Sequence, residues 1–224
     1  MTEILEIHEK NPEKRHIKTA CSFLEKGKIV LVPTETGYCF VGDSRQESSQ
    51  AHFLALRPNH PKNKPFSLVC RDLAQVSRLA QMPTSVFKIA NRVWPGPYTF
   101  ILECSKQTPK VAAGPKRKTV GIRLSSHPVL KNLMEEFQNP LLISSVTDED
   151  ALIAEEYFEQ ENQVHSWWTS ALEISNRAPK GHLAFAFEND GAVPLRVSTI
   201  IDFSQDPPVL VRDGGWDLDF LDVS

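Results

Sequence analysis

Short apolar runs alternate along the chain with segments in which apolar residues recur every three or four positions. The first such segment predicts a helix that opens at Asn11-Pro12, where asparagine suits the cap and proline the first turn, and closes at Gly27. Inside it, four apolar residues follow the helical spacing: Ile17, Ala20, Cys21 and Leu24. Residues 28–33 (KIVLVP) are β-branched and apolar, which is typical of a buried strand.

The rest of the chain continues this alternation. A polar turn occupies residues 34–37, and Ser44 with Glu47 predicts a capping box for the second helix. We expect helices at residues 44–56, 72–80, 84–93 and 126–137, and strands at 66–70, 98–102, 119–124, 141–144, 197–203 and 209–212. Residues 148–160 are helix-like but acidic, and residues 166–191 have no clean period. Strands that alternate with helices predict an α/β fold, in which helices cover a mixed sheet.

Length and composition narrow the class of protein. A chain of 224 residues is long enough to bury a sizeable core in one domain. Hydrophobic residues make up 41% and charged residues 24%, which argues against disordered, collagen-like and membrane-embedded proteins. We predict a single domain over residues 1–224, with a core at about 11–212 and an insertion-like stretch at about 149–194.

The distribution of charge changes what the net charge means. The formal net charge of −3 taken alone argues against a polyanionic partner. Residues 104–134, however, hold seven basic and no acidic side chains, whereas residues 148–176 hold eight acidic side chains and no Lys or Arg. The basic cluster Lys116-Arg117-Lys118 directly precedes the predicted strand that carries Arg123, and cations at such an edge are suited to holding phosphates. Two solvated faces of opposite sign are the simpler alternative.

The spacing of the cysteines and the lengths of the apolar runs indicate where in the cell the protein is expected. The four cysteines lie far apart without a CxxC pair, which favours free thiols in a reducing cytosol over disulfides or a zinc ribbon. Residues 1–10 carry three glutamates and no long apolar run, unlike a signal peptide. No apolar run approaches the roughly 20 residues that a membrane span needs. We therefore expect a cytoplasmic protein that does not bind membranes.

Common catalytic motifs are missing from the sequence. It contains no GxxxxGK[ST], no GxGxxG after a strand, no HExxH and no GxSxG. What remains is a set of small hydroxyls and arginines at the ends of predicted strands, where ligands of α/β sheets often bind. Each segment alone is also typical of an ordinary turn. The segments are PTETGY (33–38), LRP (56–58), GIR (121–123), SSVT (144–147), ST (198–199) and VR (211–212).

In combination, these segments resemble one family. The stretches KIVLVPTETGY (28–38), WPGPYT (94–99), VGIR (120–123) with a following HP (127–128), and STIID (198–202) with VLVR (209–212) are similar to the YrdC/YciO family. The resemblance covers most of residues 11–212, and the stretch from about 149 to 194 has no clear counterpart. It implies a twisted α/β sheet with flanking helices and a large, concave, positively charged cavity.

The resemblance also implies a chemistry. The best-known activity of the family is synthesis of threonylcarbamoyl-adenylate from L-threonine, bicarbonate and ATP, with release of pyrophosphate. We therefore expect ATP, with Mg²⁺, as a substrate, AMP as a related ligand, and neither a prosthetic group nor a protein-bound metal. The intermediate feeds modification of tRNA, and the family is also described as binding double-stranded RNA. Nucleotides and RNA are the expected partners.

Site residues follow from the resemblance position by position. Arg57 and Arg123 match catalytic arginines, the first in a Lys-x-Arg motif and the second near carboxylate and phosphate. Thr36 and Tyr38 match the turn that holds the amino-acid substrate. The expected nucleotide-binding residues are Lys118, Ser144, Ser145, Thr147, Ser198 and Arg212. The expected RNA-binding residues are Lys116, Arg117 and Lys118.

Three positions depart from the family pattern. Ala55 stands in place of the lysine of Lys-x-Arg, Thr147 in place of the asparagine of Ser-x-Asn, and Cys39 in place of a glycine. The first two changes, and the KRKT run at 116–119, resemble the YciO branch. Two functional alternatives stay open: synthase-type chemistry, or a non-synthase YciO-like protein that binds nucleotide or double-stranded RNA or hydrolyses the adenylate. A structural protein without ligand is the third interpretation.

Overall fold

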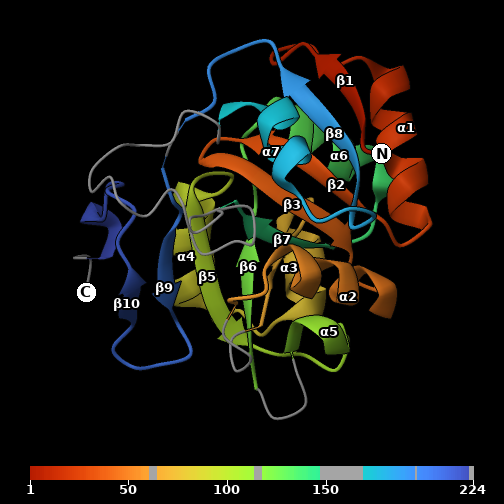
Figure 1. The fold of residues 1–224 in the computed structure, drawn as a ribbon. Helices are drawn as coiled ribbons and strands as arrows, with labels where there is room; N and C mark the ends of the chain where they lie inside the picture. The colour runs from red at the N-terminus through yellow and green to blue at the C-terminus, as the bar shows by residue number, and fades with distance from the viewer. Residues whose placement is uncertain (61–64, 114–117, 147–168, 195, 222–224) are drawn as a thin grey trace.

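The computed structural model describes residues 1–60, 65–113, 118–146, 169–194 and 196–221 (Figure 1). The strands of these residues are β1 (Glu3–Ile7), β2 (Ile29–Thr34), β3 (Gly37–Asp43), β4 (Ser67–Val69), β5 (Tyr98–Glu103), β6 (Thr119–Arg123), β7 (Leu141–Ser145), β8 (Leu183–Asn189), β9 (Thr199–Asp202) and β10 (Val209–Arg212). The helices are α1 (Lys14–Glu25), α2 (Glu47–Leu56), α3 (Leu73–Leu79), α4 (Thr84–Val93), α5 (Lys110–Ala113), α6 (Pro128–Phe137) and α7 (Ala171–Arg177), followed by a 3₁₀ turn, η3 (Asp219–Leu221).

These strands join into one mixed sheet in the order β1-β8-β2-β3-β7-β4-β6-β5-β9-β10. The pairs β1–β8, β8–β2, β4–β6 and β5–β9 are parallel, and the other neighbours are antiparallel. Helices α1 and α6 pack together over one face, while α2, α3, α4 and α7 contribute to the core on the other. The predicted α/β fold, a twisted mixed sheet with flanking helices, is therefore confirmed.

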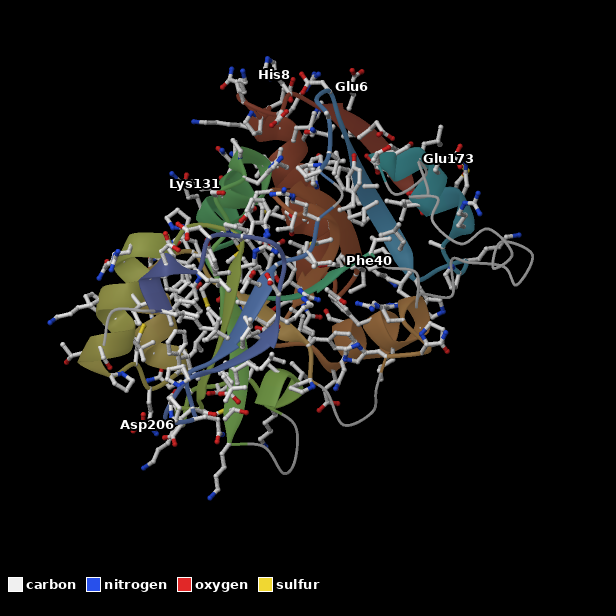
Figure 2. The ribbon with its side chains drawn as sticks, turned by 90° about the vertical axis from the view of Figure 1, so that its left-hand side faces the viewer. Glu6, His8, Phe40, Lys131, Glu173 and Asp206 are labelled. Carbon is white, nitrogen blue, oxygen red and sulfur yellow. The ribbon has the colours of Figure 1, made fainter. Side chains whose placement is uncertain are left out.

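Two central strands are covered on both faces. Every residue of β2 and β3 is buried. Because successive side chains of a strand point to opposite faces, Ile29 and Leu31 enter the core beneath α2 and α3, whereas Val30 and Val32 enter the core beneath α1 and α6. Phe40 of β3, which is fully buried, belongs to the core between the sheet and helices α2 and α3 (Figure 2).

The strands on the other side of β7 are covered less completely on one face. In β5, β6 and β9 buried residues alternate with partly exposed ones. The registers place Ile101 opposite Gly121, and Thr99 opposite both Arg123 and Ile200, so all five residues share one face. Ile101, Gly121 and Ile200 are partly exposed there, whereas Thr99 and Arg123 are buried. We call this surface the open face of the sheet.

Two glycines lie at close approaches along this sheet. Gly37, in the β2–β3 turn, has a φ of 119°, and a Cβ there would lie 3.0 Å from the carbonyl oxygen of Pro194. Gly121 lies on the open face, where a Cβ would lie 2.6 Å from Ser67 Oγ. Gly37 therefore depends on the absence of a side chain, whereas a Cβ at position 121 would require the Ser67 hydroxyl to rotate away.

Helix α3 and helix α4 match their predicted ranges closely, but the predicted starts of α1 and α2 are wrong. Helix α1 begins at Lys14 rather than Asn11, because the buried Pro12 precedes the cap residue Glu13. Ser44 makes no capping box, since its hydroxyl donates to the carbonyl oxygen of Pro140 at 2.6 Å. The cap residue of α2 is Gln46, whose side-chain amide donates instead to the last carbonyls of α1.

Three strands are absent from the sequence prediction: β1, β3 and β8. Strand β8 lies between β1 and β2 at the heart of one half of the sheet, so residues 183–189 of the stretch 149–194 belong to the core and are not an insertion. Strand β1 likewise extends the core to Glu3, before the predicted limit at residue 11. The helix predicted at residues 148–160 lies outside the described residues.

We expect Phe40→Ala to lower the free energy of unfolding by about 3–5 kcal/mol, because it removes a fully buried ring between two packed layers and leaves a cavity. Urea denaturation measures the change. Leu54→Ala on α2 is the matched control: its side chain is 46% exposed, and we expect a change within about 1 kcal/mol. Equal losses for the two variants would contradict the assignment of Phe40 to the core.

Candidate functional site

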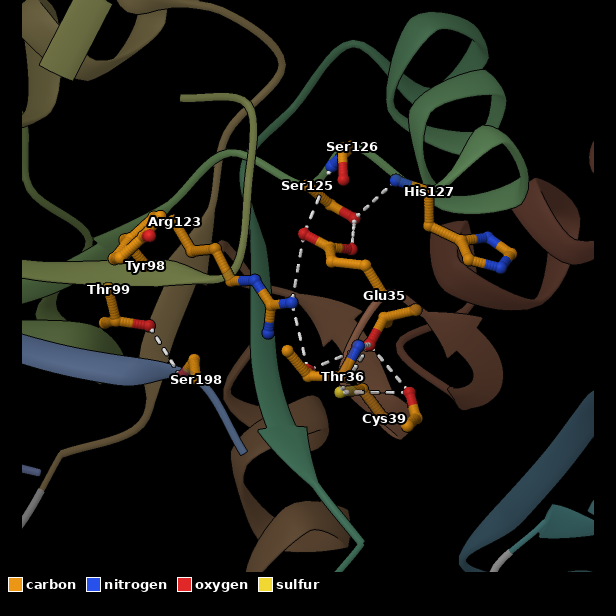
Figure 3. A network of polar contacts seen from close by, with 12 residues as sticks. Glu35, Thr36, Cys39, Tyr98, Thr99, Arg123, Ser125, Ser126, His127 and Ser198 are labelled. Atoms are coloured by element: carbon orange, nitrogen blue, oxygen red, sulfur yellow. Dashed lines mark hydrogen bonds and ion pairs between the residues drawn. The ribbon is translucent and has the colours of Figure 1, made fainter. Parts of the chain in front are cut away.

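Arg123, the last residue of β6, is buried among polar side chains at one end of the open face (Figure 3). Only 3% of the residue is exposed. Its Nη2 donates to Thr36 Oγ1 at 3.0 Å and lies 3.1 Å from Glu35 Oε1. Its Nε–H is also buried and has no acceptor among the residues that the structure describes. The guanidinium is therefore anchored through one nitrogen and keeps a buried donor for another partner.

Glu35 is held by the loop that precedes α6. Ser125 Oγ donates to Oε2 at 2.5 Å, and the backbone N–H of Ser126 donates to Oε1 at 3.1 Å. Burial would raise the pKa of Glu35, but the charge of Arg123 and these hydrogen bonds outweigh it and keep the pKa below its ordinary value. Glu35 is therefore an ionised partner of Arg123 at neutral pH.

The same loop is itself fixed at the start of α6. The backbone N–H of His127 donates to Ser125 Oγ at 3.2 Å, and His127 Nδ1 accepts from the N–H of Val129 at 3.3 Å, which caps the helix. Helix α6 thus begins at Pro128, with His127 rather than Ser126 as its cap residue. Burial lowers the pKa of the His127 ring, so the neutral form that accepts this bond is favoured.

Small polar side chains surround Thr34 in the turn between β2 and β3. Thr34 Oγ1 donates to the carbonyl oxygen of Gly37 at 2.6 Å and lies 3.2 Å from Thr36 Oγ1. Cys39 Sγ lies 3.7 Å from Thr34 Oγ1 and 3.8 Å from Ser145 Oγ. Burial raises the pKa of the Cys39 thiol, which keeps it neutral. The turn that presents Thr36 to Arg123 is thus fixed by its own hydroxyls.

Arg57, which directly follows α2, contacts Ser144 near the end of strand β7. Arg57 is the residue that ends α2, and it is 7% exposed. Its Nη1 donates to Ser144 Oγ and, at 3.0 Å, to the carbonyl oxygen of Ser145. The structure therefore brings together three of the predicted site residues, Arg57, Ser144 and Ser145, at the end of β7.

Arg212 and Ser198 form a further contact at the end of β9. Arg212 Nε donates to the Ser198 carbonyl oxygen at 2.9 Å, and Nη2 donates to Ser198 Oγ at 2.8 Å. Ser198 Oγ also lies 3.1 Å from Thr99 Oγ1, and Thr99 is the cross-strand partner of Arg123. Ser198 and Arg212 thus adjoin the end of the open face that carries Arg123.

The charges of Arg123 and Arg57 act on Arg212. Burial lowers the pKa of Arg212, and the positive charges of Arg123 and Arg57 lower it further. Arg212 therefore lies within range of the charges of both Arg123 and Arg57. Within the described part of the chain, Glu35 is the only carboxylate that contacts Arg123 or Arg212. A site of this kind, positively charged and rich in hydroxyls, is suited to carboxylate and phosphate oxygens.

This arrangement can be compared with known proteins. A family model described as "Telomere recombination", covering the Sua5, YciO and YrdC proteins, matches residues 22–214. The chain belongs to the Sua5/YciO/YrdC family. The resemblance inferred from the strand-end segments is therefore confirmed.

One relative, YciO of Escherichia coli, matches nearly the whole chain in both sequence and structure. YciO of Escherichia coli K12 is 29% identical over 97% of the chain and 98% of its own length. The crystal structure of E. coli YciO superimposes with a TM-score of 0.83 at 27% identity and covers 99% of this chain and 100% of that one.

A second relative comes from Pyrococcus abyssi and is named threonylcarbamoyl-AMP synthase. It is 27% identical over 99% of this chain but only 60% of its own length. The structure of P. abyssi Sua5 complexed with L-threonine superimposes with a TM-score of 0.80 at 27% identity and covers 97% of this chain and 59% of that chain. This chain thus spans about three fifths of the archaeal relative.

Two predicted residues lie apart from the arginine cluster. The hydroxyl of Tyr38 accepts the N–H of Asn189 at 3.0 Å and lies 3.5 Å from Glu188 Oε1, so it faces β8. Lys118 is exposed and precedes β6, whereas Arg123 ends that strand, which separates them by roughly 16 Å. The structure therefore does not group Tyr38 or Lys118 with Arg123. Lys116, Arg117 and Thr147 lie outside the described residues.

Sequence reasoning missed Glu35, Thr99 and Ser125. Glu35 stood within a segment that was selected, but its partner Ser125 is 90 positions away, and no local pattern reports that contact. The only available signal was the position of Glu35 between two threonines at a strand end, where a carboxylate suits a buried cation.

The described residues contain neither a cluster of metal-ligating side chains nor a helix that could span a membrane. Among these residues, no three His, Cys, Asp or Glu side chains lie together in a way that could hold a metal ion. None of their helices is long and apolar enough to cross a membrane.

We expect Glu35→Gln to lower the free energy of unfolding by about 1–3 kcal/mol at pH 7, because buried Arg123 loses its counter-charge. The folded-state pKa of Glu35 lies below its ordinary value of 4.5, so the ion pair stabilises the fold fully above that pH. As the pH falls through the lowered pKa, the carboxylate takes up a proton and this contribution is lost. The gap between parent and variant should therefore shrink below pH 4.5.

Urea denaturation between pH 7 and pH 3 measures this gap. Glu103→Gln, at the exposed end of β5, is the control and should leave the unfolding free energy unchanged across the range. A gap for Glu35→Gln that stays constant down to pH 3 would show that the Glu35 charge does not stabilise the fold.

Proposed function

We propose that this chain carries out threonylcarbamoyl-adenylate chemistry, with L-threonine, bicarbonate and ATP as substrates and pyrophosphate as a product. The observation that carries the proposal is the group of Arg57, Arg123 and Arg212, each hydrogen-bonded to hydroxyls or carbonyls at adjoining strand ends. Further support comes from the P. abyssi relative, whose name is threonylcarbamoyl-AMP synthase and whose structure contains L-threonine.

In this chemistry the protein positions charged reactants. The amino group of threonine and bicarbonate form a carbamate with loss of water. A carbamate oxygen then attacks the α-phosphorus of ATP, and the bond to the β-phosphate breaks to release pyrophosphate. Cations near the reacting phosphate stabilise the charge that develops in the transition state.

The residues divide between the two substrates. In the proposal Thr36 and Tyr38 hold the amino acid, and Arg123 binds its carboxylate or the phosphate nearby. Arg57 and Arg212 face the nucleotide, and Mg²⁺ enters the site bound to the phosphates of ATP. The nucleotide-binding group is completed by Ser144, Ser145, Thr147 and Ser198. Because Cys39 is neutral and Glu35 is fully engaged, catalysis rests on positioning and electrostatics.

A second candidate function is favoured by Ala55. This residue lies half-buried on α2, two positions before Arg57, where the resemblance expects a lysine. A site without that cation stabilises a triphosphate less well. The alternative is a YciO-like protein that binds a nucleotide or double-stranded RNA, or that hydrolyses the adenylate. E. coli YciO, similar over nearly the whole chain, is consistent with this branch.

RNA is proposed as the partner of the basic segment Lys116, Arg117 and Lys118. The exposed Lys118 and the buried Arg123 lie at opposite ends of β6, so an RNA backbone on that segment would contact a surface separate from the arginine cluster. We also propose a cytoplasmic location and a single domain, in keeping with tRNA as the downstream substrate.

We expect Arg123→Ala to reduce pyrophosphate release in the presence of threonine, bicarbonate and MgATP by about 10²–10³-fold, because a preorganised cation is removed from the reacting groups. Arg92→Ala, at an exposed position of α4, is the control and should retain the parent rate. Failure of the parent chain to form any adenylate, with AMP binding intact, would contradict the synthase proposal. Hydrolysis of supplied threonylcarbamoyl-adenylate would then favour the alternative.

Ala55→Lys restores a cation next to Arg57, and we expect it to raise adenylate formation at least about tenfold if the missing lysine limits the reaction. The matched control is Ala51→Lys, one turn earlier at an exposed position of α2, which should leave the rate unchanged. Chromatographic quantification of the adenylate measures both. An unchanged rate for Ala55→Lys would show that the loss at position 55 does not limit this chain.

A further inference from the structure

Glu35 has both carboxylate oxygens occupied by protein groups. Oε2 accepts the Ser125 hydroxyl at 2.5 Å, while Oε1 accepts the Ser126 N–H and contacts Arg123 Nη2, each at 3.1 Å. The carboxylate therefore lies in one orientation, set by the loop before α6 (Figure 3). A carboxylate engaged in this way is poorly placed to act as a base and well placed to hold its cation still.

The donors of Arg123 are used unequally. A guanidinium has five N–H groups, and Nη2 supplies two of them. One of them donates to Thr36 Oγ1 at 3.0 Å, and Nη2 also forms an ion pair with Glu35 Oε1 at 3.1 Å. The buried Nε–H has no acceptor among the described residues. Because buried donors are rarely left unpaired, this nitrogen marks the position of a missing acceptor such as a ligand oxygen.

We infer that Glu35 is a positioning residue that fixes the Arg123 guanidinium so that its unpaired Nε–H meets an oxygen of a bound phosphate or carboxylate. The inference rests on the proposed function, in which Arg123 contacts such a group. The negative charge of Glu35 also opposes the repulsion between Arg123 and Arg212. Without it, the neutral Thr36 hydroxyl would be the remaining anchor of Nη2 within the described residues.

A double-mutant cycle with AMP as the probe tests this role. AMP is titrated by calorimetry at pH 7 into the parent chain, Glu35→Gln, Arg123→Lys and the double variant. We expect Glu35→Gln and Arg123→Lys each to weaken AMP binding about tenfold or more, because each disturbs a charge-assisted hydrogen bond. In the double variant the effect of Glu35→Gln should vanish, since Glu35 acts only through Arg123. A purely structural role would give additive losses.

Two further variants show whether a loss of AMP binding comes from the position of Glu35 or from misfolding. Ser125→Ala removes one bond to Glu35 without touching Arg123, and it should weaken AMP binding severalfold, whereas Ser125→Thr keeps the hydroxyl and should restore it. Glu103→Gln should bind AMP as the parent does. Circular dichroism confirms that each variant is folded before titration.

The outcomes separate this inference from the proposed function. Non-additive losses support the inference even if the parent chain makes no adenylate, which would count against the synthase proposal alone. Additive losses, or no loss with Glu35→Gln and Ser125→Ala, overturn the role of Glu35 and leave the proposed function standing. Absence of AMP binding to the parent chain overturns both.

Discussion

A guanidinium keeps its charge at any pH that a protein meets, so the burial of Arg123 obliges the surrounding chain to supply acceptors. Two of them come from the β2–β3 turn, as Thr36 and Glu35. Glu35 in turn depends on Ser125 and the start of α6. One buried cation therefore links β6, the first hairpin and α6, and the geometry of the site follows from that link.

The position of the contacts between Arg123, Glu35 and Thr36 follows from the unequal burial of the two parts of the sheet. Strands β2 and β3 are buried on both faces, which makes them a rigid base for the turn that holds Glu35 and Thr36. Strands β5, β6 and β9 have an open face, and Arg123 ends β6 at the junction of these two regions. Binding residues placed on a rigid element beside an accessible surface meet two needs of a ligand site at once.

The local sequence pattern correctly predicted elements such as α3 and β2, which form mainly because of a capping residue or a run of apolar residues. Asp72 caps α3 through the N–H of Gln75 as its position suggests, and the apolar run of β2 is a strand. Strand β3 (GYCFVGD) escaped prediction because its glycines, cysteine and aspartate suit a strand poorly, and only its burial between neighbours makes it one. The arginines of the site were predictable from strand ends, whereas Glu35 required a contact across 90 positions.

The way the arginines are held bears on the ligand they suit. Arg212 donates to the hydroxyl and the carbonyl oxygen of Ser198, and Arg57 donates to the hydroxyl of Ser144 and the carbonyl oxygen of Ser145. Neutral acceptors orient a guanidinium without cancelling its charge, whereas a carboxylate does both. With Glu35 as the carboxylate of Arg123, and with neutral acceptors around Arg212, these two arginines are held in place and keep excess positive charge among the described residues. The hydrogen bonds therefore orient the guanidiniums for an anionic ligand, and their positive charge attracts it. Ala55, in place of a lysine, lowers the positive charge of the site without changing how these arginines are oriented.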